Sequence, residues 1–290
     1  MYSKIRFYRI VESIIKKFLT FKNNSKNINL LRTVRSAIYN TSKNRSTLFS
    51  NNNNVKLLLH NNDIVSKTLF IDQEFDFKVL KKGIKLLEKK KKSRLTLVNV
   101  GAHIGSSCIP AIKNNYFKNL IVFEPVKRNF RLLTANILLN KIEDRTKIYN
   151  LALSNKKKNL YMKMFTNSGD CRILKKKQLN CELVKSDILD NYTSNLNKNN
   201  SLIFMDAQGH EPKIFLGAQK TIRKKIPFIF ELLPQLYNKT WLKDFSQLFK
   251  NYSYFFDLKN TKKTKFNAIN LSKLFNSYRL NNDYTDIMII

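Results

Sequence analysis

Two apolar runs of the sequence end in residues that could bind an adenosine-bearing cofactor. The run 95–100 ends in a turn that contains Gly101 and Gly105, and the run 120–123 ends in the carboxylate of Glu124. Glycines let a backbone approach a ligand closely. A carboxylate about 20 residues after such a turn binds ribose hydroxyls, and Glu124 follows Gly105 at close to that separation. These residues therefore predict a cofactor site at the carboxyl edge of a parallel sheet.

The spacing of the two glycines limits the choice of cofactor. The turn lacks the third glycine of the dinucleotide fingerprint, and no lysine follows it as a P-loop requires. The turn is thus poorly suited to bind a pyrophosphate or a triphosphate, and a nicotinamide oxidoreductase is disfavoured. S-adenosylmethionine carries no phosphate and needs only close backbone approach and a ribose carboxylate, so we expect it as the cofactor. Its expected contacts are the turn, the acid and their neighbours, namely Asn99, Gly101, Ala102, His103, Gly105, Glu124 and Pro125.

Acidic residues at the same predicted edge could serve a second substrate. Asp206 follows the apolar run 202–205, where ligand sites of open α/β sheets cluster. It would position an acceptor or act as a base, and the alternative is a cap on the helix that begins near Pro212. Glu211 and Glu231 also fall at loop or strand ends on this edge, although a solvent salt bridge is the alternative for Glu231.

Two further residue types could contribute to acceptor binding. His210 lies on the same edge, and imidazole is a natural general base near neutral pH. A polar surface role is the alternative for His210 and for His103. Asn167 belongs to the polar loop 167–170, which would close over the acceptor, although ordinary turn chemistry also explains its composition.

The elements expected to position these residues alternate between strands and helices. The expected strands are 95–100, 120–123, 147–151, 159–165, 202–205, 228–232, 252–258, 264–267 and 286–290. The expected helices are 75–87, 106–113, 126–139, 212–223 and 241–249. Continuously apolar strands separated by helices predict a parallel sheet covered on both faces. The fold class is therefore α/β, a doubly wound and mostly parallel sheet.

The N-terminal part differs from the rest of the chain in its residue composition and its apolar pattern. Residues 1–19 show apolar positions at helical spacing with lysines and arginines between them, which predicts a basic amphipathic helix. This helix would pack on protein or lie on an anionic bilayer. Residues 23–63 are polar and are expected to have weak structure apart from a short helix over 30–38. We thus divide the chain into an extension, 1–69, and a catalytic domain, 70–290.

Composition indicates a basic protein of a reducing compartment. The 54 Lys and Arg residues exceed the 20 Asp and Glu residues by 34, a balance typical of nucleic-acid or membrane binding. The charge is scattered, however, and codons rich in A and T would also produce it, so a nucleic-acid partner is disfavoured. Three irregularly spaced cysteines and three histidines show neither a disulfide framework nor metal-ligand spacing. No apolar run of 18 residues occurs, so we expect no transmembrane span, no metal and a cytoplasmic location.

Four segments of the chain resemble the FkbM-type family of S-adenosylmethionine-dependent methyltransferases. They are VNVGAHIG (98–105), VFEPVKRNFRLLTANILLN (122–140), LIFMDAQGHEPKIFLGA (202–218) and FIFELLP (228–234). The resemblance implies methyl transfer from S-adenosylmethionine to a hydroxyl oxygen of a saccharide or small metabolite, and it implies that Glu211 belongs to the site. The sequence departs from the family pattern at Asn99, where Asp is usual, and at Phe204, where Lys is usual.

Two other functions stay open at this point. The first is methylation of RNA or another nucleic acid, which the net charge of +34 favours. The second is a catalytically weak cofactor-binding module of the same fold, which the departures at Asn99 and Phe204 favour. For the main hypothesis, Asp206, Glu211 and His210 are the candidate catalytic residues, and Glu231 and Asn167 are the candidate acceptor contacts.

Overall fold

The computed structural model describes residues 25–41, 47–50, 55–60, 63–88, 94–174, 176–237 and 240–290. The predicted basic helix over residues 1–19 lies outside these residues. None of the helices within them combines the length and the apolar content that a membrane crossing requires.

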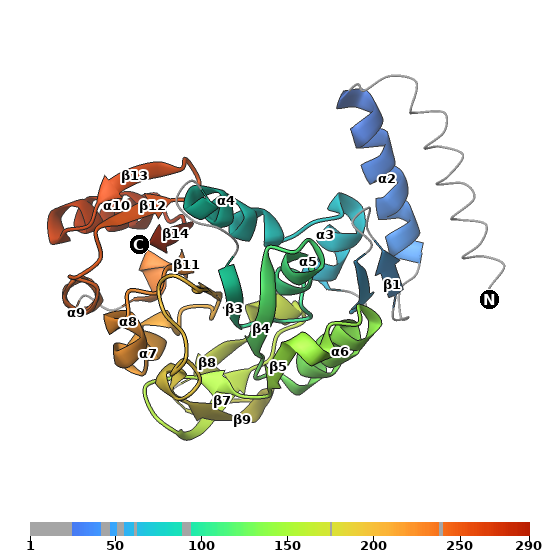
Figure 1. The fold of residues 1–290 in the computed structure, drawn as a ribbon. Helices are drawn as coiled ribbons and strands as arrows, with labels where there is room; N and C mark the ends of the chain where they lie inside the picture. The colour runs from blue at the N-terminus through green and yellow to red at the C-terminus, as the bar shows by residue number, and fades with distance from the viewer. Residues whose placement is uncertain are drawn as a thin grey trace.

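A central eight-stranded sheet organises the molecule (Figure 1). Its strands are β3 (Arg94–Val100), β4 (Phe117–Phe123), β5 (Thr146–Tyr149), β10 (Ser201–Met205), β11 (Phe228–Leu232), β12 (Tyr254–Asp257), β13 (Lys262–Lys265) and β14 (Thr285–Ile289), in the order β13-β12-β14-β11-β10-β3-β4-β5. The five strands from β11 to β5 are parallel, and β14 runs antiparallel to both of its neighbours. The predicted doubly wound, mostly parallel sheet is confirmed.

The strand order reverses beside β3. The chain passes from β3 to β4 and β5 on one side and returns to β10 on the other side. At such a switch point the loops after neighbouring strands diverge, which leaves a crevice at the carboxyl ends. The structure therefore provides a ligand crevice between the turn after Val100 and the loop after Met205.

Both faces of the sheet are covered because its strands are buried on both sides. Leu97, Val122 and Leu202 pack against α3 (Ile64–Asp72), α4 (Phe77–Glu88), α5 (Cys108–Lys113) and α6 (Lys127–Leu139). Val98 and Ile203 face the opposite cluster, formed with α7 (Glu211–Leu216), α8 (Gln219–Arg223), α9 (Trp241–Leu248) and α10 (Ala268–Leu280). The side-chain alternation of each strand thus supplies two apolar layers.

Several elements differ from the sequence prediction. The single helix predicted over 212–223 is divided into α7 and α8 at Gly217, where an added Cβ would lie 2.1 Å from the Ser154 carbonyl oxygen. Helices α3 and α10 are additional to the prediction. Their mixed polar and apolar sequences have weak helical periodicity.

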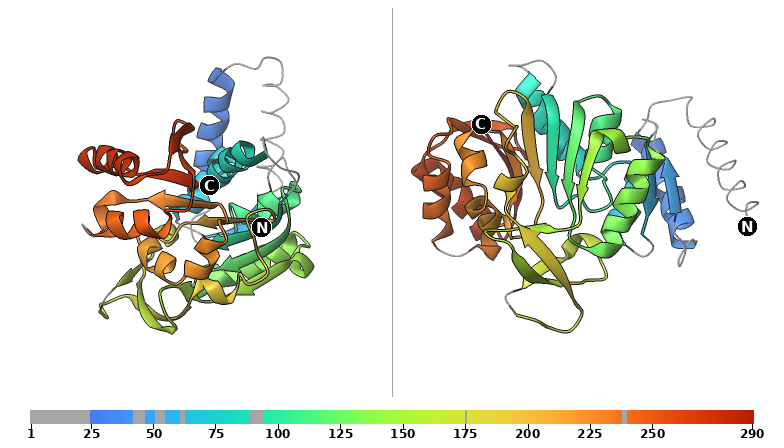
Figure 2. Two further views of the ribbon diagram at one scale, coloured as in Figure 1. Left: turned by 60° about the vertical axis from the view of Figure 1, so that its left-hand side comes forward. Right: turned by 60° about the horizontal axis from the view of Figure 1, so that its bottom comes forward.

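A second sheet of four short strands adjoins the first. Its strands are β6 (Ala152–Leu153), β7 (Lys158–Lys163), β8 (Arg172–Leu174) and β9 (Cys181–Asp187), in the order β6-β9-β7-β8, with short 3₁₀ turns before and after it at Glu143–Arg145 (η1) and Leu189–Asn191 (η3). Figure 2 shows this sheet below the central strands in its right-hand view. The loop between β7 and β8 contains the 3₁₀ turn η2 (Ser168–Asp170), which lines the crevice.

Residues before the first central strand are part of the folded core. They form α2 (Ser25–Thr41), a hairpin of β1 (Thr47–Ser50) and β2 (Lys56–Leu59), and then α3. The side-chain amide of Asn136 bonds both backbone groups of Leu58, with N–H to Oδ1 at 2.6 Å and Nδ2 to O at 3.2 Å. Asn140 bonds Lys56 in the same way. The expectation of weak structure is wrong here, because β2 pairs with β1 and is also bonded by the asparagine amides of α6.

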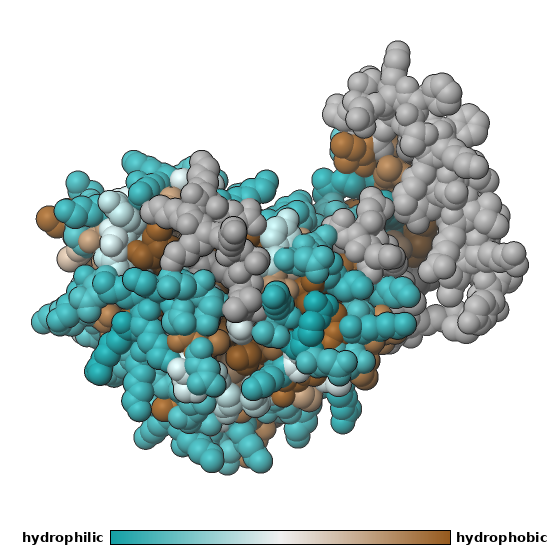
Figure 3. Space-filling model, in the orientation of Figure 1, coloured by the Kyte–Doolittle hydropathy of each residue, from teal (hydrophilic) through white to brown (hydrophobic). Residues whose placement is uncertain are grey.

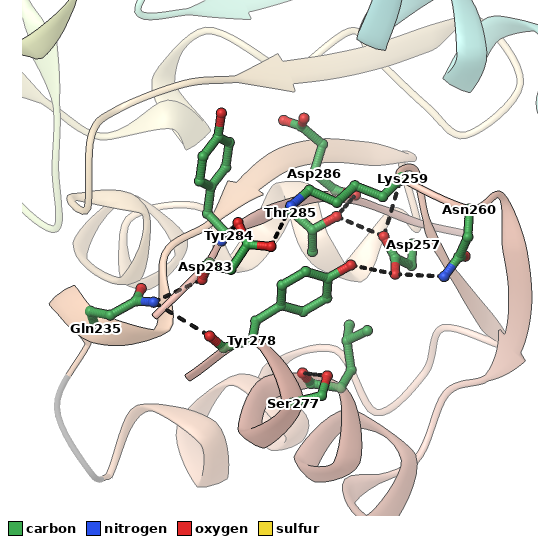
Figure 4. Close-up of polar contacts among 11 residues, drawn as sticks. Gln235, Asp257, Lys259, Asn260, Ser277, Tyr278, Asp283, Tyr284, Thr285 and Asp286 are labelled. Carbon is green, nitrogen blue, oxygen red and sulfur yellow. Dashed lines mark hydrogen bonds and ion pairs between the residues drawn. The ribbon is translucent and has the colours of Figure 1, made fainter. Parts of the chain in front are cut away.

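The antiparallel end of the sheet is held by one buried carboxylate (Figure 4). Asp257, at the end of β12, accepts hydrogen bonds from the hydroxyls of Thr285 at 2.6 Å and Tyr278 at 2.8 Å, and from the Asn260 amide at 3.0 Å. Figure 4 shows Tyr284 and Asp286 pointing away from this network, as alternation along β14 requires. The network therefore fixes the strand that presents Tyr284 and Asp286 to the crevice.

The described surface is mainly polar. Figure 3 shows teal side chains over most of the described part of this face, with apolar groups between them. Scattered apolar exposure is ordinary for a folded protein.

We expect Asp257→Ala to lower the free energy of unfolding by about 2–4 kcal/mol, because it leaves buried hydroxyl donors without an acceptor. Urea denaturation measures the change. The exposed Asp144 provides the control, since Asp144→Ala should change stability by less than about 0.5 kcal/mol. Equal effects of the two substitutions would contradict the role given to Asp257.

Candidate cofactor and acceptor site

The turn after β3 is in direct contact with the end of β10. Gly101 has a φ of +75°, and an added Cβ would lie 1.8 Å from the backbone oxygen of Asp206. The N–H groups of Gly101 and Ala102 donate to the Phe123 carbonyl at 2.9 and 3.0 Å. Only glycine fits this conformation and this contact. The turn thereby joins the carboxyl ends of three neighbouring strands.

Glu124 lies at the end of β4 as the sequence predicts. Its side chain is 4% exposed. Oε2 accepts the His103 N–H at 2.8 Å, and Oε1 accepts the Val126 N–H at 2.9 Å and the Asn129 amide at 3.4 Å. Burial raises the pKa of Glu124 to about 7, although these hydrogen bonds oppose the increase. Three hydrogen bonds therefore hold the carboxylate in place at the end of β4, in the lining of the cavity.

A cavity of about 530 Å³ opens at the carboxyl ends of the central strands. Among the described residues, six acidic side chains line it, and the one lysine or arginine that does so is Arg172. The six acids are Asp76, Glu124, Asp170, Asp206, Glu231 and Asp286. In a chain of net charge +34, the described lining of the cavity is therefore rich in acidic groups and poor in basic ones.

The carboxylates opposite Glu124 influence one another. Gln208 donates to Asp206 at 2.8 Å and to Glu231 at 3.4 Å, and Glu231 is the cross-strand neighbour of Asp286. Burial, followed by the charge of Asp206, raises the pKa of Glu231 to about 9 and that of Asp286 to about 7. Burial also raises the pKa of Asp206 and that of Asp76. Glu231 therefore holds a proton at neutral pH.

Both predicted histidines line the cavity and are neutral. Burial lowers the pKa of His103 to about 4 and that of His210 to about 4, the latter with help from the charges of Lys158 and Lys213. His210 Nε2 lies 3.0 Å from Ser154 Oγ. His103 Nε2 lies 2.5 Å from Ser168 Oγ. Each imidazole is thus anchored through one ring nitrogen.

Three residues predicted for the site do not line the cavity. Asn99 is fully buried behind the turn, where its amide donates to the Phe204 carbonyl at 3.3 Å and accepts from the Ser107 hydroxyl at 3.2 Å. Gly105 packs against Ile109. The Glu211 carboxylate is also fully buried and accepts the Ala207 N–H at 2.8 Å and the Tyr237 hydroxyl at 3.1 Å. These residues shape the loops that carry the cavity lining.

The other predicted residues, Ala102, Pro125 and Asn167, do line the cavity. Asn167 Oδ1 is buried, and no described residue donates a hydrogen bond to it. The structure adds Asp76, Asp286 and Asn129, which sequence reasoning missed. The only signal for Asp76 and Asp286 is a carboxylate beside an apolar run, and this pattern is also typical of caps and strand ends.

The described residues contain no group of three histidine, cysteine or carboxylate side chains arranged to bind a metal.

A comparison with protein-family models matches residues 99–256 to the methyltransferase FkbM domain. Among solved structures, the chain is similar to methyltransferase FkbM from Methylobacillus flagellatus KT, with 13% identity and a TM-score of 0.43 over 80% of this chain and 56% of that one. M. jannaschii TYW2 in complex with AdoMet gives 12% identity and a TM-score of 0.40 over 86% and 85%. P. horikoshii TYW2 in complex with MeSAdo gives 13% and 0.38 over 92% and 86%. The chain thus spans little more than half of the Methylobacillus protein, and a search of curated proteins found no match.

The parallel sheet, the glycine turn at its switch point and the strand-end glutamate define a Rossmann-like methyltransferase domain. The family match covers more than half of the sequence, and the chain belongs to the FkbM methyltransferase family. The resemblance seen in the sequence is confirmed.

The buried Glu211 makes stability depend on pH. Burial raises the pKa of Glu211 from 4.5 to about 7, so between these values the unfolded chain is ionised while the folded chain keeps its proton. This group therefore lowers the free energy of unfolding as pH rises through that window. Glu211→Gln removes the titration and keeps an oxygen for the Ala207 N–H. We expect the stability of the variant relative to the native chain to rise between pH 4.5 and 7, by up to about 1.4 kcal/mol per pH unit.

Urea denaturation at several pH values across this window tests the expectation. Glu143→Gln, at an exposed glutamate, controls for the chemical change itself. If the difference in stability between Glu211→Gln and the native chain does not vary with pH, Glu211 is not the source of the pH dependence.

Proposed function

We propose that the chain transfers a methyl group from S-adenosylmethionine to a hydroxyl oxygen of a saccharide or small hydroxylated metabolite. The acid-lined cavity carries this proposal. Carboxyl groups form hydrogen bonds with hydroxyl groups, whereas the described lining offers a phosphate-rich strand a single basic side chain, Arg172. The lining therefore disfavours RNA as the acceptor in spite of the net charge of +34.

The cofactor would lie at the β3 and β4 side of the cavity. Gly101 and Ala102 allow close backbone approach, Glu124 accepts a hydrogen bond from the ribose, and Pro125 lines the wall. Asn99 and Gly105 support this side from behind. The acceptor would occupy the opposite side, with Asp206, Glu231, His210 and Asn167 around it.

Asp206 is the proposed general base. When the acceptor oxygen attacks the sulfonium methyl, the new O–C bond forms as the C–S bond breaks, the sulfonium becomes a neutral thioether, and the hydroxyl proton must leave. Because the charge of Asp206 helps to raise the pKa of Glu231 to about 9, Asp206 is the member of the pair that ionises first and can accept the proton. Glu211 would act only by holding the loop that carries Ala207 and Gln208.

We also propose that the catalytic unit begins before residue 70. Val55, Leu57, Leu59 and Val65 are buried in the same cluster as the central strands. Ile64 and Val65 line the cavity as well.

Isothermal titration with S-adenosylmethionine tests the cofactor assignment. We expect Glu124→Gln to weaken binding by about 10-fold, since it replaces a charged hydrogen-bond acceptor. The exposed Glu143→Gln is the control and should bind as the native chain does. Absence of binding by the native chain would remove the enzymatic proposal.

Transfer of labelled methyl groups to a panel of saccharides and small alcohols tests the chemistry. We expect Asp206→Asn to lower kcat by about 10²–10⁴-fold, because a general base contributes this much, with little change in cofactor affinity. Asp144→Asn controls for loss of an acid elsewhere. Cofactor binding without transfer to any acceptor would instead favour a non-catalytic module, and transfer to RNA would contradict the acceptor class.

A further inference from the structure

The acceptor capacity of Glu124 is nearly exhausted by the protein. A carboxylate offers about four acceptor positions. The N–H groups of Val126 and His103 and the amide of Asn129 occupy three of them, which leaves one position on Oε2. A ribose presents two neighbouring hydroxyls. The second hydroxyl therefore needs another acceptor close to Oε2.

The ring of His103 is such an acceptor. His103 is the residue whose backbone N–H bonds Glu124 Oε2, and His103 lines the cavity. Asn129 connects the same groups, because its amide lies 3.4 Å from both Glu124 Oε1 and the Ser168 carbonyl oxygen. His103 and Glu124 thus belong to one hydrogen-bond network, and both line the cavity.

The hydrogen bonds of Ser168 assign the tautomer of this ring. Ser168 is 3% exposed, and both its N–H and its hydroxyl donate to Asp63 Oδ1 at 2.7 Å. A hydroxyl has one hydrogen, and a carboxylate is the stronger acceptor for it. The Ser168 oxygen must then accept from His103 Nε2–H. Nδ1 carries the lone pair, and no bond to Nδ1 is found among the described residues.

Asp63 holds this arrangement from the N-terminal segment. Its side chain is 3% exposed, and Oδ2 accepts the Ser66 N–H at 2.9 Å as the N-cap of α3. Asp63 is thus fixed by the start of a helix on one side and bonded to the loop of the small sheet on the other. Burial lowers the pKa of His103 to about 4, which keeps the ring neutral.

We propose that His103 Nδ1 accepts the second ribose hydroxyl of the cofactor, and that Ser168 and Asp63 are positioning residues that fix the ring and its tautomer for this contact. The proposal rests on the proposed function, since it requires S-adenosylmethionine in the cavity. It brings residues from the N-terminal segment and from the small sheet into cofactor recognition.

A thermodynamic cycle between protein and ligand tests the proposal. The affinities of S-adenosylhomocysteine and of its 2′-deoxy and 3′-deoxy analogues are measured by titration calorimetry for the native chain, Ser168→Ala and Asp63→Asn. For the native chain, we expect removal of each hydroxyl to weaken binding by about 10-fold, the equivalent of one hydrogen bond. For Ser168→Ala, one of the two analogues should bind within about 2-fold of the parent ligand. A purely structural role would lower all three affinities equally.

The variants are chosen so that folding does not obscure the result. Asparagine caps helices as well as aspartate does, so Asp63→Asn keeps α3. If Ser168→Ala does not fold, Asp63→Asn serves in its place, and it should likewise bind one of the two deoxy analogues about as tightly as the parent ligand. Ser186→Ala is the matched control, because Ser186 is also 3% exposed and also hydrogen-bonded, but does not line the cavity. It should keep the native preference for both hydroxyls.

Two outcomes would overturn the proposal, and they differ. In the first outcome, removal of each hydroxyl weakens binding to Ser168→Ala and Asp63→Asn by the same factor as binding to the native chain. His103 then does not contact the ribose, and the methyltransferase proposal survives. If the native chain binds none of the three ligands, the proposed function fails together with the inference.

Discussion

The close approach of two backbones at the switch point is the constraint on which the site depends. The turn after β3 meets the end of β10 so closely that a single methyl group at Gly101 would overlap the Asp206 carbonyl. This contact sets the distance between the strand that supplies the cofactor turn and the strand that supplies the proposed base. Glu124 is tied to the same turn through the His103 N–H. The groups proposed to bind the cofactor and to act as the base are therefore placed by one rigid junction, and methyl transfer requires preorganisation of this kind.

The chain as a whole is rich in basic residues, whereas the described lining of the cavity is rich in acidic ones. Lysines and arginines are abundant in the chain, yet the described cavity lining has a single cation and six acids. Buried acids without a nearby cation take up protons, and burial raises the pKa of Glu231 to about 9 for this reason. The cavity thus contains both charged and protonated carboxyl groups, which accept and donate hydrogen bonds. The proposed acceptor, a neutral molecule rich in hydroxyl groups, would use both kinds of hydrogen bond, and the net charge of the whole chain says little about this surface.

The sequence predicts the parallel half of the sheet well, because buried strands are continuously apolar and end sharply at Gly101, Glu124 and Asp206. The sequence is a poorer guide to polar residues whose side chains form buried hydrogen bonds within the fold. Glu211 and Asn99 have the residue types of a catalytic site, but three-dimensional packing turns their side chains toward the backbone. Asp63 shows the opposite case. It lies in a polar stretch without periodicity, and only the fold brings it to Ser168, 105 residues later in the chain.

The asparagine pair of α6 has a consequence for how the molecule opens. Asn136 and Asn140 each bond both backbone groups of one residue of β2, so the N–H groups of Lys56 and Leu58 are protected by a helix and not by another strand. Local fraying of the hairpin exposes these amides only if their hydrogen bonds to Asn136 and Asn140 also break. Helix α6 also carries Asn129 beside Glu124, so the N-terminal segment and the proposed cofactor site are both bonded to the same helix, as expected of a cooperative unit. Occupancy of the cofactor site would then slow amide exchange in a hairpin remote from it in sequence.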